Sequence, residues 1–69
     1  MDDVNTQNNV FDTYAREVRR EAGFRFGIGI RVEEMGYEYP AHSPERKLCF
    51  EMAKEIKERA EQMLEGVRP

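Results

Sequence analysis

Five arginines and no lysine lie between positions 16 and 31. An arginine guanidinium presents a planar fork of donors that binds phosphate or carboxylate through two hydrogen bonds. Two glycines separate a pair of these arginines, and glycines on one face of a strand expose backbone that a ligand or partner strand can approach closely. The pattern predicts an anion-binding or partner-binding surface whose candidate residues are Arg19, Arg20, Arg25, Gly27, Gly29 and Arg31.

A purely structural interpretation of the same segment stays open. The arginines would then be solvated, or would pair with the nine acidic residues of positions 32–69. The glycines would let a helix pack closely on a sheet. The segment also lacks the GxxxxGK[ST] pattern and the position between a strand and a helix that a phosphate-binding loop requires.

No residues have the spacing of a catalytic nucleophile and its base. His42 is the only histidine, and Ser43 beside it is better placed to cap a helix than to attack a substrate. Cys49 is the only cysteine and can form no disulfide within the chain. Glu33 and Glu34 are adjacent in a predicted strand, where their side chains would point to opposite faces. We therefore expect a protein that is not an enzyme and that holds no cofactor and no metal.

The segment from Asn9 to about Ala22 is predicted to be a helix. Asn9 can cap its N-terminus, and Gly23 can end it in a left-handed conformation. Residues 1–8 are mostly polar, and we expect them to form a mobile N-terminal arm. The apolar face of this helix recurs at steps of three and four residues and consists of Phe11, Tyr14, Ala15, Val18 and Ala22.

The strictest pattern in the chain runs from Phe24 to Glu33. Apolar residues occupy every even position, and glycine or charged residues occupy every odd one. Period two with aromatic and β-branched residues is typical of a strand, whereas each glycine inside a helix would cost about 1 kcal/mol. We therefore predict a strand here, a turn at positions 34–36 and a short antiparallel partner strand over Tyr37–Tyr39 that Pro40 ends.

Residues from Ser43 to about Glu65 carry the signals of a second helix. Ser43 is the expected N-cap, Pro44 suits the first helical position, and Gly66 suits the end. The spacing predicts exposed ion pairs between Lys54 and Glu58, Glu55 and Arg59, and Lys57 and Glu61. Phe50, a large apolar ring, lies beside Lys54 and Lys57 at the edge of the apolar stripe of this helix. The stripe consists of Cys49, Met52, Ala53, Ile56, Ala60, Met63 and Leu64.

The predicted order of elements is helix, strand, short strand, helix, which is an α+β fold in a single small domain over residues 1–69. Two strands make a marginal sheet with unpaired edges, and a core of this size rarely supplies more than about 3–5 kcal/mol. We therefore predict a homo-oligomer, dimer or larger, over a monomer with a frayed sheet edge. The predicted core is Phe11, Tyr14, Val18, Phe24, Phe26, Ile28, Ile30, Val32, Met52, Ile56, Ala60 and Met63.

Charge and hydropathy narrow the classes of function. Charged residues make up 36% of the chain, and the net charge is −3. This acidic balance argues against a domain that binds duplex DNA, because such domains are usually basic. No apolar run approaches the roughly 20 residues that a helix needs to cross a bilayer. We expect no membrane association and a cytoplasmic location, in the host cytoplasm if the protein is viral.

The start of the second predicted helix, from His42 to Leu48, resembles the opening of the C-terminal helix of phage anti-defence proteins that sequester nucleotide second messengers. Together with the amphipathic helix into which these residues lead, the match covers about a third of the chain. It implies a small, non-catalytic oligomer that binds cyclic nucleotides between its subunits. The chain differs from that family in having no tryptophan, and in the predicted strand where one branch of the family is helical. No functional residue is transferred on this basis.

These observations predict a small non-enzymatic binding or regulatory protein. One form of this hypothesis is a phage-type inhibitor of host defence that binds a host protein or an anionic nucleotide stoichiometrically. The alternative is a nucleic-acid-binding transcriptional or accessory regulator that uses the strand rich in arginine and glycine. A small enzyme subunit fits least, since no acid–base constellation is present.

Overall fold

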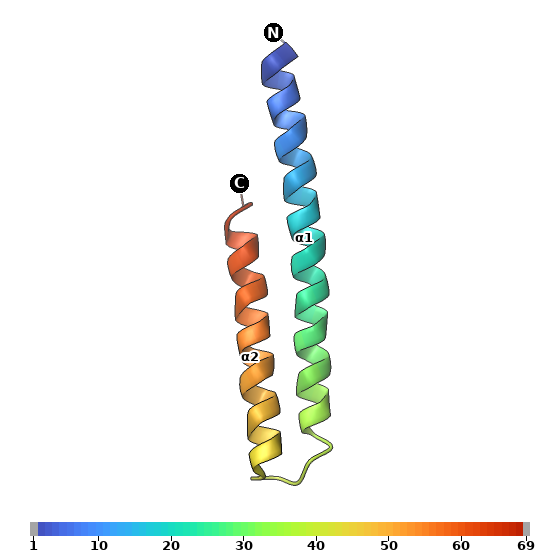
Figure 1. The fold of residues 1–69 in the computed structure, drawn as a ribbon, viewed down its shortest axis with the longest axis vertical. Helices are drawn as coiled ribbons and strands as arrows, with labels where there is room; N and C mark the ends of the chain where they lie inside the picture. Colours follow the sequence, from blue (N-terminus) through green and yellow to red (C-terminus); the bar gives the residue numbers. More distant parts are fainter. Residues whose placement is uncertain (1, 69) are drawn as a thin grey trace.

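The protein is a hairpin of two antiparallel α-helices (Figure 1). The computed structural model describes residues 2–68, and the side chains of residues 9–68. Helix α1 spans Asp2–Gly36 and helix α2 spans Pro44–Glu65. Residues 37–43 connect them, and the whole measures 62 × 14 × 12 Å. At 1.5 Å per residue the 35-residue α1 is about 20 Å longer than the 22-residue α2, so its N-terminal part extends beyond the end of α2.

The predicted α+β fold is wrong, because residues 2–68 contain no strand. The chain continues as α1 through Gly23, which was expected to end a helix, and through the predicted strand from Phe24 to Glu33. The predicted partner strand over Tyr37–Tyr39 is a turn. Its amides donate to carbonyl oxygens three residues earlier, at 3.1–3.2 Å, which tightens the end of α1.

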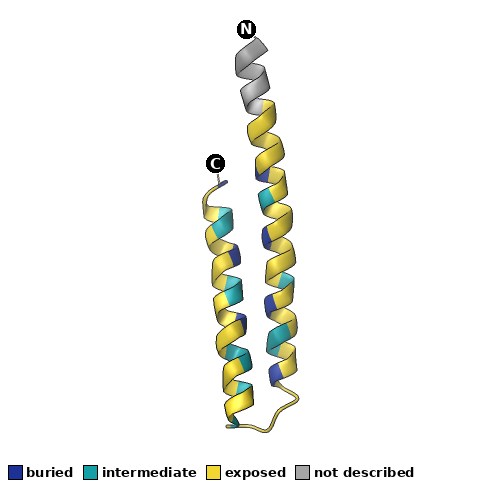
Figure 2. Ribbon diagram, viewed as in Figure 1, coloured by how far each residue is buried: buried dark blue, intermediate teal, exposed yellow. Residues whose placement is uncertain are grey.

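Small residues line the contact between the two helices. On α1 they recur every seven residues, which keeps them on the side facing α2 in a packed helix pair. Figure 2 shows these buried positions along the facing edges of both helices. We call this line the small-residue seam; it consists of Ala15, Ala22, Gly29 and Gly36 on α1 and Ala53 and Ala60 on α2, all of them buried.

The two glycines of the seam have no room for a side chain. A Cβ atom placed on Gly29 would lie 2.8 Å from Cγ of Lys57 and 3.3 Å from the backbone oxygen of Ala53. A Cβ atom on Gly36 would lie 2.7 Å from a ring carbon of Phe50. Real Cβ atoms do not approach other atoms to such distances, so the packing at both levels depends on the missing side chain.

The seam explains why the alternating segment is helical. In a helix, residues four apart share a side, so Phe24 and Ile28 lie on one flank of the seam while Phe26 and Ile30 lie on the other. Gly29 lies between the two flanks and faces α2. The period-two pattern therefore arises from two apolar flanks on either side of a narrow seam, not from the two faces of a strand.

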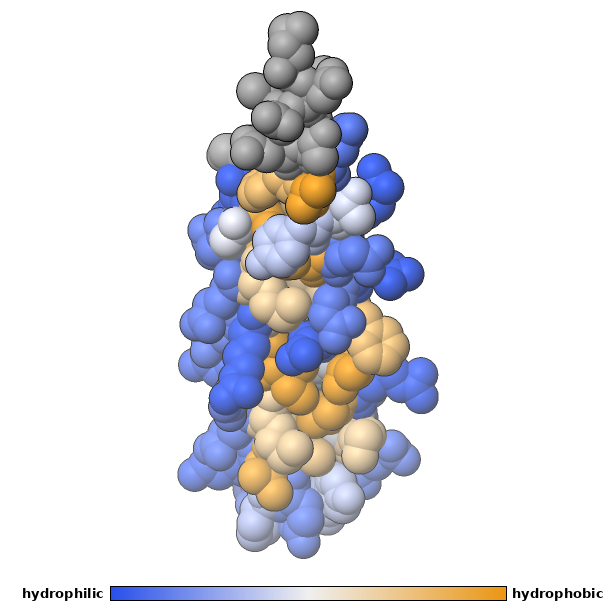
Figure 3. Space-filling model, turned by 45° about the horizontal axis from the view of Figure 1, so that its top comes forward, coloured by the Kyte–Doolittle hydropathy of each residue, from blue (hydrophilic) through white to orange (hydrophobic). Residues whose placement is uncertain are grey.

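The seam leaves the large apolar side chains outside. The buried hydrophobic residues are alanines and one valine, Val67, and no large side chain is fully buried within the described residues. The predicted core is therefore wrong for most of its members, of which only Ala60 is buried. In Figure 3 the apolar side chains form a band along the molecule, bordered by hydrophilic atoms.

One flank of the seam carries large apolar side chains from both helices, and we call it the apolar face. Its residues follow helical spacing on each helix, and grooves between them join Phe24 and Ile28 to Ile56, and Ile56 to Met52. All but Ile56, which is half-buried, are 40% to 67% exposed. The apolar face consists of Phe24, Ile28 and Met35 of α1 and Leu48, Met52 and Ile56 of α2.

The second helix agrees with its local sequence signals. The Ser43 side chain accepts a hydrogen bond of 3.1 Å from the amide of Arg46, Pro44 occupies the first helical position, and the helix ends before Gly66. Two of the predicted ion pairs form, Lys54–Glu58 at 4.0 Å and Arg59–Glu55 at 3.2 Å. The predicted Lys57–Glu61 pair is replaced by a pair between Lys57 and Glu33 of α1, at 3.2 Å.

The N-terminal arm that was predicted to be mobile comprises residues 1–8. The side chains of these residues lie outside the described part, so their mobility stays a prediction. Neither described helix has a stretch that is both long and apolar enough to pass through a membrane.

The seam predicts opposite effects for alanine at two nearby glycines. A Cβ atom on Gly27 would meet no atom within 4 Å, so Gly27→Ala gains helix propensity and should raise the free energy of unfolding by about 0.5–1 kcal/mol. Gly29→Ala gains the same propensity but forces α2 away, and it should be less stable than Gly27→Ala by about 1–3 kcal/mol. Urea unfolding at one fixed chain concentration measures both. Equal stabilisation by the two substitutions would contradict close packing at Gly29.

Candidate functional site

The arginines predicted to form a binding surface are distributed around α1. Arg20 pairs with Glu17 at 2.7 Å and Arg25 with Glu21 at 3.3 Å, each within the helix. Arg19 reaches the C-terminal end of the hairpin, where its guanidinium donates to the backbone oxygen of Val67 at 3.5 Å. The contacts of Arg20 and Arg25 are local, that of Arg19 joins the two helices, and the three arginines have no common target.

The remaining predicted site residues also fail to form one surface. Gly29 is buried in the small-residue seam, whereas Gly27 lies away from it. Arg25 and Arg31 are six residues apart, which places them about 120° apart around a helix. The structure therefore does not bring together the glycine surface bordered by arginines that a strand would have presented. The structural interpretation of the glycines holds for Gly29, although a helix and not a sheet is the packing surface.

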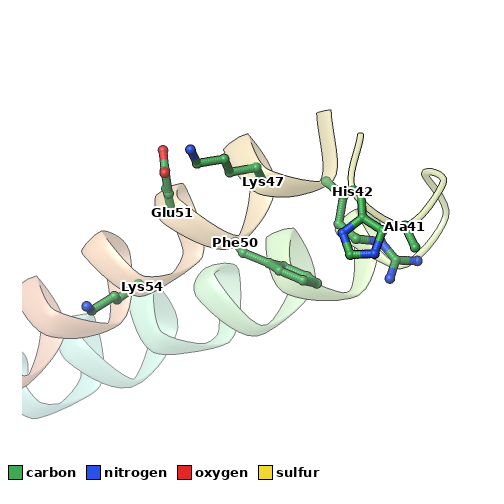
Figure 4. Close-up of a pocket in the computed structure, with 7 residues that line it drawn as sticks. Ala41, His42, Lys47, Phe50, Glu51 and Lys54 are labelled. Atoms are coloured by element: carbon green, nitrogen blue, oxygen red, sulfur yellow. The ribbon is translucent and has the colours of Figure 1, made fainter. Parts of the chain in front are cut away.

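A pocket of about 610 Å³ lies at the hairpin turn, and we call it the turn pocket (Figure 4). The end of the connector and the first turns of α2 provide its walls. Phe50 supplies an aromatic ring, which packs against Gly36 and meets the Tyr37 ring edge-on at a centroid distance of 5.1 Å. The turn pocket is lined by Ala41, His42, Arg46, Lys47, Phe50, Glu51 and Lys54.

Arg46 fixes the shape of the turn pocket. Its Nε donates to the carbonyl oxygens of Gly36 and Tyr39, each at 3.1 Å, and its Nη2 donates to that of Tyr37 at 3.1 Å. These oxygens belong to the last residue of α1 and to the connector, so one side chain caps the first helix and ties the connector to the second. Its guanidinium carbon also lies 5.4 Å from the centre of the Tyr37 ring and 6.0 Å from that of Phe50.

The turn pocket has a positive charge balance. Three permanently basic side chains, Arg46, Lys47 and Lys54, line it together with a single acidic one, Glu51. Lys54 makes a 4.0 Å pair with Glu58, but its side chain is 79% exposed, so water screens this contact strongly. The geometry offers two exposed ammonium groups, a guanidinium held by backbone oxygens and a ring, which suits an anion that carries a planar group.

Reasoning from the sequence missed this site, although it contained two signals. Phe50 lies beside Lys54 rather than on the apolar stripe, and that position is where the ring meets α1. Arg46 lies seven residues before Ala53, so a charged residue continues the seam at the end of the hairpin. An arginine at a seam position can be understood only from the paired structure. There, α1 ends opposite Arg46 and exposes its last carbonyl oxygens to it.

The described residues contain no group of three or more His, Cys, Asp or Glu side chains that could hold a metal ion. Comparison of the chain with protein-family models, curated proteins and solved structures finds no match. The resemblance of residues 42–48 to nucleotide-sequestering phage proteins therefore stays a prediction. Three of these residues, His42, Arg46 and Lys47, line the turn pocket, and they do not by themselves assign a ligand.

The contacts of Arg46 predict that lysine cannot replace it. An ammonium group cannot reproduce the planar fork that reaches three carbonyl oxygens, so Arg46→Lys should lower the free energy of unfolding by about 1–2 kcal/mol. Arg59→Lys is the matched control, because Arg59 makes one exposed contact to Glu55, and it should change stability by less than about 0.5 kcal/mol. Chemical unfolding of both variants measures the difference. Similar losses in the two would mean that Arg46 does not cap α1.

Proposed function

We propose that the protein is a non-enzymatic binding protein that holds an organic anion with a planar ring, such as a nucleotide, in the turn pocket. The observation that carries this proposal is the grouping of Arg46, Lys47 and Lys54 around Phe50 at one end of the hairpin. Binding is stoichiometric, and its effect is to sequester the ligand. Of the hypotheses drawn from the sequence, this one corresponds to a phage-type inhibitor that binds an anionic nucleotide. The protein would act in the cytoplasm.

Each lining group has a distinct part in the proposed complex. Lys47 and Lys54 lie two turns apart on α2 and act as point charges that neutralise phosphate oxygens. Arg46 already donates hydrogen bonds to backbone oxygens. It therefore adds positive potential to the pocket and fixes the position of the connector, but it does not bind the ligand directly. Phe50 supplies an apolar surface for a planar ring, and base–aromatic stacking contributes about 1–3 kcal/mol per base in other proteins.

The arrangement of His42 and Ser43 favours binding over catalysis. His42 is exposed and adopts a left-handed backbone conformation with φ 67°, and no hydrogen bond joins its side chain to another described residue of the pocket. The Ser43 hydroxyl is occupied as the N-cap of α2. A nucleophile needs a base within hydrogen-bond reach, and the pair adjacent in sequence does not supply it.

Thermal unfolding with a panel of ligands tests the proposal. ATP, cyclic AMP and a cyclic dinucleotide carry both phosphate and a ring, whereas adenosine and inorganic phosphate carry one each. At a ligand concentration 100 times Kd, binding adds about 2.7 kcal/mol and should raise Tm by about 10 °C or more. We expect such a rise with at least one nucleotide and little with adenosine or phosphate alone.

Two double variants that remove the same charge from different places test whether the turn pocket is the binding site. Lys47→Gln with Lys54→Gln should weaken nucleotide binding at least tenfold, because two phosphate contacts are lost. Arg16→Gln with Arg20→Gln removes the same charge from exposed positions of α1 and should leave Kd unchanged. Equal losses in both double variants, or no nucleotide-dependent rise in a folded protein, would overturn the proposal. Binding of DNA that weakens steeply with salt would instead support the nucleic-acid-binding alternative.

A further inference from the structure

We propose that a second copy of this chain covers the apolar face, so that two hairpins form a four-helix bundle. The apolar face shares no residue with the turn pocket, and this inference does not rest on the proposed ligand. Its large side chains come from both helices, over positions 24–35 of α1 and 48–56 of α2, and Figure 3 shows an apolar band along the molecule. The face is therefore a two-helix surface of the kind that packs in helical bundles.

The exposed apolar area matches what a stable dimer needs. A large side chain offers roughly 200 Å² when fully exposed, so the five residues of the face that are 40% to 67% exposed leave on the order of 500 Å² in water. A standard protein interface buries about 800 Å² per partner, of which roughly 60% is apolar. One such face on each hairpin supplies that amount.

The hairpin also has an apolar overhang that a second chain would cover. Val10, Phe11 and Tyr14 are 54% to 63% exposed on the part of α1 that approaches and passes the end of α2. The Phe11 and Tyr14 rings contact each other at a centroid distance of 6.4 Å. An isolated helical segment of this length is marginal in water without packing, so the extension of α1 gains most from a neighbouring helix.

Charge along the apolar face favours a copy of the same chain as the partner. Symmetric pairing brings a patch against itself, so the patch must tolerate its own charges. The charged residues that line the grooves of the face form two internal pairs of opposite sign, Glu21 with Arg25 and Glu55 with Arg59. Two copies therefore meet without an excess of either charge, whereas a partner chosen for strong charge would find nothing complementary here.

The opposite flank of the seam is a weaker candidate for this contact. There, Lys57 lies over the Phe26 ring at 5.9 Å and Arg46 lies over the Phe50 ring at 6.0 Å. These cationic side chains cover the rings and keep charge at the surface. On the apolar face no cation lies over an aromatic ring among the described residues. Arg25 and Arg59 line its grooves but pair with Glu21 and Glu55, so this is the flank that a second chain would bury.

Two isoleucines provide a matched test. Ile28 lies on the apolar face and Ile30 on the opposite flank of the same helix, with exposures of 40% and 42%. Sedimentation equilibrium of the unaltered chain from about 1 to 200 μM should give twice the chain mass at the upper end. Ile28→Glu should shift the dimer midpoint to at least a hundredfold higher concentration, and Ile30→Glu should shift it by less than tenfold.

The controls keep the test decisive. If Ile28→Glu loses its helical circular dichroism, Ile28→Gln replaces it, and the unaltered chain remains a test by itself. A single-chain mass for the unaltered protein over the whole range would overturn the inference and leave the apolar face for a different protein. Equal dissociation by both isoleucine variants would overturn its assignment to this face. Nucleotide binding is measured separately, so the turn pocket and the dimer can fail independently.

Discussion

The close approach of two helices at glycine and alanine determines most of this structure. At Gly29 and Gly36 the packing distances leave no room for a Cβ atom. A seam this narrow buries only small residues, as Ala15, Ala22, Ala53 and Ala60 do. It cannot also enclose the phenylalanines and isoleucines beside it, because they lie on its flanks. The hairpin is therefore closely packed along one line and incompletely buried on both sides of it.

The two flanks of the seam differ in how their large apolar side chains are covered. On one, Lys57 crosses from α2 to pair with Glu33 at 3.2 Å and lies over the Phe26 ring, and Arg46 covers Phe50 at the turn. Those long side chains shield apolar surface with their carbon stems and carry charge to water. On the other flank no cation lies over an aromatic ring among the described residues, and the two arginines in its grooves, Arg25 and Arg59, pair with Glu21 and Glu55 of their own helices. The same seam thus leads to a charged pocket on one side and an uncovered hydrophobic surface on the other.

The sequence predicts α2 well and α1 poorly, for a physical reason. Ser43, Pro44 and Gly66 act on the backbone beside them, so their signals are local and the observed ends agree with them. The alternation after Gly23 is ambiguous on local grounds, because a strand with one apolar face and a helix with two apolar flanks produce the same pattern. The seven-residue spacing from Ala15 to Gly36 resolves it, but only once Ala53 and Ala60 are recognised as its partner. Nothing in the structure explains the glycine at Gly27.

Which residues form the candidate site is likewise determined by how the two helices pack against each other. Arg25 and Arg31 would share a surface only in a strand, and the helix separates them. The turn pocket exists because α1 ends opposite Arg46, and no property of α2 alone reveals that. Each turn pocket is complete within one chain, whereas the family resemblance implied a ligand held between subunits. If two chains pair through their apolar faces, each keeps its own pocket, so the bundle should bind one ligand per chain, and a ratio of one ligand to two chains would favour a site between subunits.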